Sequence, residues 1–168
     1  MALDETTKPL YPSVERVRAA LAPYGAENRI ILLGDSARTA AEAAAGLGCP
    51  VGAIVKSLVF EHAGRAVMAL VAGDRMCDTA ALGRALGLGQ PPRRASAELV
   101  REATGFAIGG VSPFGHPGRL PMAVDASLAR FELLHAAAGH PNAVFPLTYQ
   151  ELLAWTEGKP ANDLAPER

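Results

Sequence analysis

Two apolar, β-branched runs that lie close together in the chain constrain the fold more than any other feature. Residues 53–60 read AIVKSLVF and residues 66–72 read AVMALVA, with only a short polar link, EHAGR, between them. Such runs on both sides of a short link that contains glycine are typical of an antiparallel β-hairpin. Both faces of the first run are mostly apolar, as a central strand requires. The sequence therefore predicts a sheet with this hairpin in its interior.

Capping residues mark the predicted helices. A serine, threonine or aspartate side chain can accept a hydrogen bond from a backbone N–H in the first turn of a helix. The helices predicted in this way are capped by Ser13, Thr39, Asp78, Ser96 and Thr148. Thr39 and Thr148 are each followed three residues later by a glutamate, which is capping-box spacing. Gly25 ends the first of these helices, and Gly46 and Gly48 close the second.

The remaining strands are predicted around a long segment that cannot be helical. Residues 106–121, FAIGGVSPFGHPGRLP, contain four glycines and three prolines, so only an irregular loop fits. Residues 88–95, LGQPPRRA, are read as a turn, and residues 139–142, GHPN, as another. The other predicted strands are RIILL at 29–33, MAVD at 122–125, FELLHAA at 131–137 and AVFPL at 143–147.

The order of these elements indicates the fold class. Helices and strands do not alternate strictly, and two strand pairs look antiparallel, so we expect an α+β fold, a single domain with a curved mixed β-sheet flanked by helices. A chain of 168 residues can bury a core of its own. We expect a flexible N-terminus at residues 1–12, one domain over 13–160 and a C-terminal tail at 161–168 that can fray.

Composition excludes several classes of function. The formal net charge is −1, which argues against a protein that coats DNA or RNA by neutralising phosphates. The two cysteines, Cys49 and Cys77, have no metal-like spacing, so we expect no metal site, no disulfide framework and a reducing compartment. We see no signal peptide in MALDETTKPLYPS and no apolar stretch long enough to cross a bilayer. A cytoplasmic protein without membrane association is the expectation.

A lysine in the middle of the first apolar run is the most unusual residue of the sequence. Lys56 shares a strand face with Ile54 and Leu58, and an ammonium group is costly to remove from water unless an anionic group meets it. Two interpretations stay open: Lys56 reaches the rim of the sheet and guards an edge against aggregation, or the strand directs a cation at a substrate.

Residues 109–113, GGVSP, form the second notable feature. Glycines permit positive φ and let a ligand approach backbone N–H groups, so the loop can present donors to a carboxylate, phosphate or carbonyl oxygen. An ordinary wide turn between a helix and a strand explains the same residues, and this alternative stays open.

Taken together, IVKSLVF, GGVSPFG and LPMAVDASL resemble, in order and approximate spacing, the YbaK/EbsC family. These proteins are free-standing relatives of the editing domain inserted in bacterial prolyl-tRNA synthetases. The likeness runs from about residue 40 to residue 156 and is carried by the lysine strand and by a Gly-x-x-x-Pro loop, Gly109 to Pro113. It implies the family's fold and a trans-editing aminoacyl-tRNA deacylase, with mischarged tRNA(Pro) as the expected substrate.

The resemblance also implies roles for individual residues. Lys56 would contact the phosphate of the terminal nucleotide or the ester region. The loop would hold the aminoacyl group through its backbone, with Gly109, Gly110, Val111, Ser112 and Pro113 as its members. Water would attack the ester with help from the ribose hydroxyl, without a cofactor. The expected partners are the acceptor end of the aminoacyl-tRNA and, potentially, prolyl-tRNA synthetase.

Four other polar residues are candidates, each with an alternative interpretation or an argument against it. Ser57 can line the mouth of the pocket, although strand alternation places it on the face opposite Lys56. His116 is either a proton carrier or a solvated loop residue. Asp125, where the family also tends to have an aspartate, either orients the lysine or the ribose or caps the next turn. Within the loop, Ser112 either donates to the substrate or satisfies the turn.

One region departs from the family's pattern. Where the best-known cysteinyl-tRNA(Pro) deacylases carry a glycine- and lysine-rich turn, this chain has AAGHPNAVF. His140 and Asn142 either face the aminoacyl pocket and alter specificity or form a proline-assisted hairpin turn. The amino acid that is removed therefore stays open.

Three arginines and two other functions complete the predictions. Arg93, Arg94 and Arg119 are candidate phosphate contacts, with a solvated basic surface as the alternative.

A non-catalytic module that binds aminoacyl-adenosine or a synthetase would have much the same sequence. A hydrolase that uses His116 as general base on another ester or amide is a third hypothesis.

Overall fold

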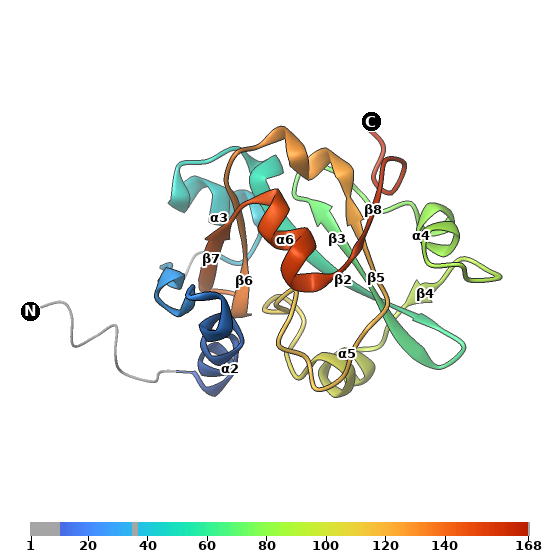
Figure 1. Ribbon diagram of the computed structural model, residues 1–168, viewed down its shortest axis with the longest axis horizontal. Coiled ribbons are helices and arrows are strands. Elements are labelled where there is room, and N and C mark those ends of the chain that lie inside the picture. The colour runs from blue at the N-terminus through green and yellow to red at the C-terminus, as the bar shows by residue number, and fades with distance from the viewer. Residues whose placement is uncertain (1–10, 35–36, 168) are drawn as a thin grey trace, which may run out of the picture.

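A mixed β-sheet organises the part of the chain that the computed structural model describes, residues 11–34 and 37–167 (Figure 1). Within these residues the strand order is β1-β7-β6-β2-β3-β5-β8, and the short β4 also pairs with β2. The strands are β1 (Ile31–Leu32), β2 (Ile54–His62), β3 (Arg65–Ala72), β4 (Arg93–Arg94), β5 (Met122–Asp125), β6 (Leu134–His140), β7 (Ala143–Leu147) and β8 (Lys159–Ala161). The α+β class with a mixed sheet is confirmed. Residues 1–10 of the predicted flexible N-terminus lie outside the described residues.

The predicted hairpin is the centre of this sheet. β2 and β3 pair antiparallel over eight registered residue pairs, among them Lys56 with Val71. Ala63 and Gly64 between them have φ of 52° and 80°. Positive φ at both turn residues gives the backbone twist that matches two paired strands, which is why glycine suits this position. β6 and β5 flank the hairpin, each running parallel to its neighbour.

Four of the five predicted helix caps are confirmed. The helices are α2 (Pro12–Leu21), α3 (Ala40–Leu47), α4 (Thr79–Ala85), α5 (Ala97–Thr104) and α6 (Tyr149–Thr156). The side chains of Thr39, Asp78, Ser96 and Thr148 accept first-turn N–H bonds, and Thr148 forms a full capping box with Glu151.

The prediction for Ser13 is wrong. The first helix begins one residue earlier, at Pro12, with Tyr11 at the N-cap and no side-chain cap. Proline is well placed at the first helical position because its fixed φ suits a helix and its missing N–H would be unpaired there anyway. Gly25 ends the short 3₁₀ turn that follows this helix, with φ of 68°.

Two segments that we expected to be irregular or loosely held form strands. Arg93 and Arg94, within the predicted turn at 88–95, pair with Glu61 and Phe60 of β2. The C-terminal tail does not fray as expected, because β8 pairs with β5, and Leu164 and Ala165 are buried.

The strand predicted at residues 131–137 is displaced along the chain. β6 begins at Leu134 and extends to His140, into the predicted turn at 139–142. The register with β7 shifts between Ala137 and His140, as at a β-bulge. Gly139 in this bulge has φ of 91°, and a Cβ there would lie 2.5 Å from the Ser13 carbonyl oxygen. Only glycine allows α2 to approach β6 this closely.

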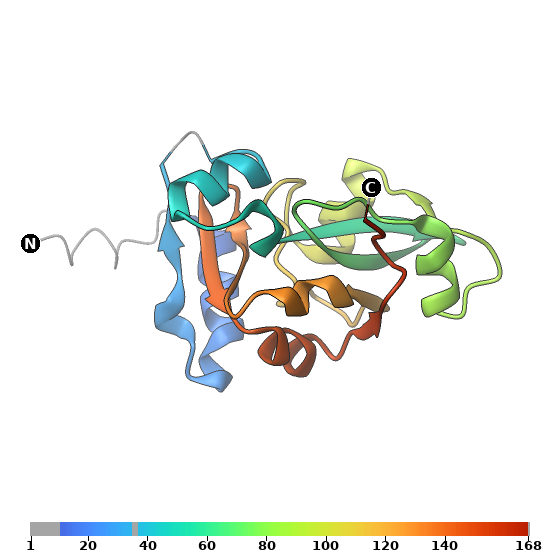
Figure 2. The ribbon, with the colours of Figure 1, turned by 90° about the horizontal axis from the view of Figure 1, so that it is seen from above.

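Strand alternation on β2 divides the apolar residues between the two faces of the sheet. Ile54 packs with Ala43 and Ala44 of α3 on one face. Val55 belongs to the main core on the other face, which includes Leu152 of α6. Figure 2 shows α3 and α6 on opposite sides of the sheet. Lys56 therefore points to the α3 side, among Leu58 and Phe60, as its position in the run predicts.

Candidate functional site

β2 has an open edge in the middle of the sheet. Opposite β3, its other edge pairs with β6 at Ile54 and Val55 and with β4 at Phe60 and Glu61. No described strand pairs with the intervening residues 56–59 on this edge. A gap therefore separates β6 from β4 beside the predicted lysine.

The main chain of Ser57 faces this gap. The backbone N–H groups of Met68 and Ala72, on β3, point away from β2, to the Pro121 carbonyl oxygen and the Asp125 carboxylate. Their registered partners on β2, Val59 and Val55, must then also direct their N–H and C=O groups away from β3. Ser57 lies between these partners in the same alternation, so its N–H and C=O project into the gap.

A cavity of about 600 Å³ lies at this gap and is lined by residues from both faces of the strand. Its polar lining residues are Arg38, Thr39, Lys56, Ser57, Cys77, Arg94 and His135. Its apolar walls come from α3, from both faces of β2 and from the loop at Ile108, Gly109 and Val111. The lysine strand and the glycine loop that the sequence singled out thus line one cavity.

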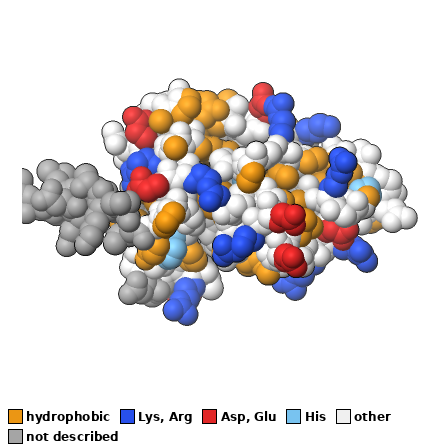
Figure 3. Space-filling model, turned by 90° about the horizontal axis from the view of Figure 1, so that it is seen from below, with side chains coloured by type: hydrophobic (Ala, Val, Ile, Leu, Met, Phe, Trp, Pro, Cys, Tyr) orange, Lys and Arg blue, Asp and Glu red, His pale blue; other side chains and the backbone are white. Residues whose placement is uncertain are grey.

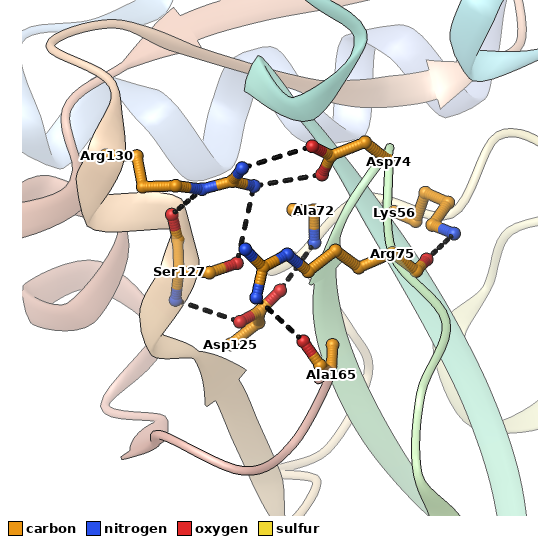
Figure 4. Close-up of polar contacts among 8 residues, drawn as sticks. All are labelled: Lys56, Ala72, Asp74, Arg75, Asp125, Ser127, Arg130 and Ala165. Carbon is orange, nitrogen blue, oxygen red and sulfur yellow. Dashed lines mark hydrogen bonds and ion pairs between the residues drawn. The ribbon is translucent and has the colours of Figure 1, made fainter. Parts of the chain in front are cut away.

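Lys56 is half-buried in this cavity, and its ammonium group makes a hydrogen bond to the main chain. Its Nζ donates to the Arg75 carbonyl oxygen at 2.5 Å (Figure 4). Burial lowers the pKa of the ammonium, and the acidic groups Asp74 and Asp125 and the thiol of Cys77 partly offset this effect. Lys56 is therefore neither a rim residue nor an edge guard in bulk solvent.

The acidic groups near Lys56 are engaged by other partners. Asp74 forms a two-pronged ion pair with Arg130 at 2.9 and 3.1 Å, which lowers the pKa of that carboxyl group (Figure 4). Among the ion pairs of the described residues, none includes Lys56. Its charge thus faces the cavity without a bound carboxylate, which is the arrangement that favours an anionic ligand.

Gly109 and Gly110 have different reasons to be glycine. Gly109 lines the cavity with φ of 96°. A Cβ on Gly110 would lie 2.8 Å from the Cα of His140, so this residue seats the loop against β6. The Gly110 N–H donates to the Ala107 carbonyl oxygen at 3.0 Å and is occupied within the loop. Gly109 and Val111 line the cavity, whereas Gly110 does not. Their backbone groups are therefore better placed than that of Gly110 to contact a ligand in the cavity.

The second half of the loop is buried and is fixed by hydrogen bonds within the segment itself. Ser112 is fully buried, and its Oγ accepts from the Phe114 N–H at 3.4 Å, which favours the turn-satisfying interpretation. Pro113 is buried beside it. The Nε2 of His116 lies 2.8 Å from the Ser112 carbonyl oxygen, so this ring donates to the loop. Burial lowers the pKa of His116 and favours the neutral ring. His116 is not among the residues that line the cavity.

The contacts of Asp125 favour the interpretation that it caps the next turn. It is 1% exposed, and its two carboxylate oxygens accept from the N–H groups of Ala72 and Ser127 at 3.0 and 2.9 Å. It ends β5 and begins the 3₁₀ turn at Ala126–Arg130. Its charge influences Lys56 through space, and it makes no hydrogen bond to that residue among the described contacts.

The remaining candidate residues lie around the mouth of the cavity. His140 stacks on Tyr11 at 3.8 Å, and its Nδ1 accepts from the Asn142 N–H. With Asn142 it lines an adjoining hollow that shares Arg38 and Gly109 with the main cavity. Both interpretations of this turn, a hairpin and a pocket wall, are therefore compatible with the geometry.

The three predicted arginines are not equivalent. Arg94 lines the cavity and is exposed. Arg93 pairs with Glu61, and Arg119 pairs with Glu157, so both have acidic partners on the surface. The face drawn in Figure 3 shows basic side chains interspersed with acidic and apolar ones.

His135 is a cavity residue that the sequence analysis missed. It lies on β6 beside Ile54, is 8% exposed, and its Nδ1 is buried without a hydrogen-bond partner. The only sequence signal is a polar residue within an apolar strand. That signal does not reveal that the strand lies next to Lys56.

The structure holds no further chemical constellation within its described residues. These residues contain no group of three or more histidine, cysteine and acidic side chains suited to a metal ion. None of their helices has the length and hydropathy that a bilayer crossing requires. Burial raises the pKa of Cys49 and, most strongly, raises that of Cys77 to about 11.

Comparisons with known proteins identify a family and several relatives. The family described as aminoacyl-tRNA editing domain matches residues 34–154. The uncharacterized protein YwhH of Bacillus subtilis (strain 168) is 33% identical over 88% of this chain and 93% of that protein. A proline–tRNA ligase of Solidesulfovibrio magneticus is 36% identical over 65% of this chain, a match that spans 18% of that ligase.

A solved structure shares both the fold and much of the sequence. It is described as a candidate trans-editing enzyme for prolyl-tRNA synthetase, and it superposes with a TM-score of 0.86 at 43% identity. The match covers 94% of this chain and 99% of that chain, so the architecture described above is common to both.

Proposed function

The chain belongs to the aminoacyl-tRNA editing domain family, and from this premise we propose that it is a trans-editing aminoacyl-tRNA deacylase. Its substrate is a mischarged tRNA, with tRNA(Pro) as the first candidate because one relative is a proline–tRNA ligase and one structural neighbour is described as editing for that synthetase. We place the reaction in the cytoplasm, where tRNAs are charged.

One observation carries this proposal. Lys56 is a half-buried cation that lines the cavity and has no carboxylate partner among the described ion pairs, while the glycine loop forms another part of the same cavity. Within a site shielded from water, a fixed positive group interacts with negative charge more strongly than it would in solvent. A terminal phosphate, or an ester oxygen that gains negative charge during hydrolysis, meets this requirement.

The main chain supplies the other contacts of the proposed site. The N–H and C=O of Ser57 point into the gap in the sheet, and the backbone of Gly109 borders it. Such groups can bind the ester, the ribose or the base without a side chain. We assign the exposed Arg94 and Arg38, both at the cavity, to the phosphates of the tRNA acceptor end.

The proposed reaction is hydrolysis of the ester between the amino acid and the terminal ribose. Water adds to the ester carbonyl, the acyl C–O bond breaks, and a proton goes to the ribose oxygen that leaves. The products are a free amino acid and an uncharged tRNA. The neighbouring ribose hydroxyl is suited to relay the proton, and the protein contributes positioning and electrostatic stabilisation.

The thiol near Lys56 is poorly suited to attack the ester itself. A thiol reacts as thiolate, and burial with the nearby Asp78 raises the pKa of Cys77 to about 11. The Ser57 hydroxyl is buried and has no hydrogen-bond partner among the described residues that could remove its proton. Direct attack by water is therefore the mechanism that these residues favour.

The test is ester loss from a panel of mischarged tRNAs. Cys-, Ala-, Ser- and Thr-tRNA(Pro) are incubated with the wild type, Lys56→Ala and Lys159→Ala. Lys159 is the matched control, because it is an exposed lysine of β8 away from the cavity. We expect deacylation of at least one substrate by the wild type and by Lys159→Ala, and loss of that activity in Lys56→Ala.

Two results would contradict the proposal. Equal hydrolysis by Lys56→Ala and the wild type would remove Lys56 from the site. Stoichiometric binding of aminoacyl-tRNA or of prolyl-tRNA synthetase without any ester loss would replace the enzyme by a binding module.

A further inference from the structure

His135 is an anomaly within the described part of the chain. Only three buried side-chain polar atoms there have no hydrogen-bond partner: Glu27 Oε2, Ser57 Oγ and His135 Nδ1. Two of the three belong to residues that line the same cavity. A buried polar atom without a partner lowers stability, so its presence requires an explanation.

The described surroundings of His135 give no structural role to its Nδ1. On β6 it is registered with Ile54 of β2 and Pro146 of β7, neither of which has a polar side chain. Burial lowers its pKa, which favours the neutral ring. A neutral imidazole offers one donor and one acceptor.

The side chains that line the cavity near His135 are mostly small and apolar. Ile54, the registered neighbour of His135, packs with Ala40 and Ala43 of α3, and these residues and Ala137 of β6 line the cavity. The Thr39 hydroxyl, which also belongs to a lining residue, caps α3 and contacts Glu42. Small apolar walls with one unpaired imidazole suit a small group that can both donate and accept a hydrogen bond.

We propose that His135 is a specificity-determining residue that hydrogen-bonds the hydroxyl or thiol of a small aminoacyl side chain. This inference rests on the proposed deacylase function and names its preferred substrates, seryl-, threonyl- or cysteinyl-tRNA over alanyl-tRNA. A site built to pair with a hydroxyl rejects a substrate that lacks it, because its own polar atoms are then left unpaired.

Two substrate pairs that differ by one hydroxyl test the proposal. They are Ser- against Ala-tRNA and Thr- against 2-aminobutyryl-tRNA. The enzymes are the wild type, His135→Leu, His135→Gln and His62→Leu, the last being a histidine-to-leucine control at the far end of β2. We expect His135→Leu to lower kcat/KM about tenfold for Ser and Thr and to leave Ala and 2-aminobutyrate within about twofold.

Two further readouts separate specificity from folding. Because His135 has an unpaired buried nitrogen, His135→Leu should unfold at the same or a higher urea concentration than the wild type. His135→Gln, which keeps a donor and an acceptor, should recover part of the preference for Ser over Ala. An unchanged Ser/Ala ratio in His135→Leu, or an equal loss on all four substrates, would overturn the proposal.

Failure of the deacylase itself is a different result. If the wild type hydrolyses none of the four esters, binding of the amide analogues 3′-seryl- and 3′-alanyl-amino-adenosine is measured by calorimetry. A preference for the seryl analogue that His135→Leu removes would support the role of His135 without catalysis. The same ratio of dissociation constants in both proteins would refute it.

Discussion

The Lys56 ammonium donates a 2.5 Å hydrogen bond to the carbonyl oxygen of Arg75, a residue that lies 19 positions later and follows β3. The Arg75 guanidinium in turn donates to the Ala165 carbonyl oxygen, and Arg130 holds the preceding Asp74 (Figure 4). The segment that orients the lysine is thus fixed by the C-terminal residues. The cation is held by a neutral acceptor, which leaves its charge available to a ligand.

The first prediction concerns the charge of Lys56. Lys56→Met keeps much of the side-chain volume but removes the cation, so we expect kcat/KM for deacylation to fall by about 100-fold or more. Because burial disfavours the ammonium, the unfolding free energy should not decrease. Single-turnover deacylation and urea unfolding measure the two effects. A large loss of stability would mean that the lysine is structural.

The second prediction concerns the seat of the glycine loop. Gly110→Ala places a Cβ 2.8 Å from the His140 Cα, so the loop must move and both activity and stability should fall. Gly118→Ala is the matched control, since nothing lies within 4 Å of its added Cβ. Deacylation rates and unfolding midpoints of both variants check this. Equal behaviour of the two variants would contradict the packing described for Gly110.

The third prediction concerns pH. Burial lowers the pKa of His116 and of His135 in the folded state, so on acidification the unfolded chain takes up protons first, below pH about 6.5. The unfolding free energy should therefore decrease as the pH falls through 6.5 and level off below the folded-state pKa. Urea unfolding at pH 7.5, 6.5 and 5.5 measures this slope.

The His116→Leu variant measures how much of this pH dependence of the unfolding free energy comes from His116. His116→Leu should reduce it, leaving the contribution of His135. Asp74 and Glu151, whose pKa values are lowered by arginine partners, lose their contributions only at more acidic pH. An unchanged slope in His116→Leu would show that this histidine is not shielded in the folded state.

The fourth prediction separates the two interpretations of Asp125. Asp125→Ala leaves the N–H groups of Ala72 and Ser127 without an acceptor, and we expect a loss of about 3 kcal/mol in unfolding free energy. Asp125→Asn keeps one acceptor oxygen and should lose less. Equilibrium urea unfolding measures both. A stable Asp125→Ala protein that has lost only activity would restore the substrate-orienting role.

The fifth prediction concerns the cysteines. In a Cys49→Ser background, the rate of alkylation of Cys77 by iodoacetamide should rise with pH up to a midpoint near 11, because the buried thiol ionises at about 11. Mass spectrometry of quenched samples follows the reaction. A midpoint near the ordinary thiol pKa of about 8.5 would reopen Cys77 as a nucleophile.

Local chemistry explains which parts of the fold could be predicted. The caps at Thr39, Asp78, Ser96 and Thr148 and the hairpin turn at Gly64 depend on residues within a few positions of one another, and all were predicted. β4 and the buried C-terminal segment could not be predicted, because both are ordered by partners far away in the sequence. Short polar segments such as these carry no periodicity of their own.

The candidate site divides in the same way. Lys56 and the loop at 109–113 are unusual enough in their own segments to be noticed, and the structure places Lys56, Gly109 and Val111 around one cavity. The alternatives for Ser112, Asp125 and His116 depended on which distant backbone groups they meet. His135 was missed because a histidine in an apolar strand becomes notable only when its neighbours are known.

By itself, the sequence determined four of the helix caps, the central hairpin, the faces of its strands and the two segments that carry the family likeness. Each of these depends on backbone preferences and side-chain alternation over a few residues. The tertiary structure alone decided that β6 and β4 leave residues 56–59 unpaired, and that the resulting gap brings Lys56, Ser57 and His135 to one cavity. The pairing of β2 with β6 joins Ile54 to His135, far apart in the sequence, and the end points of such pairings follow from the packing of the whole chain.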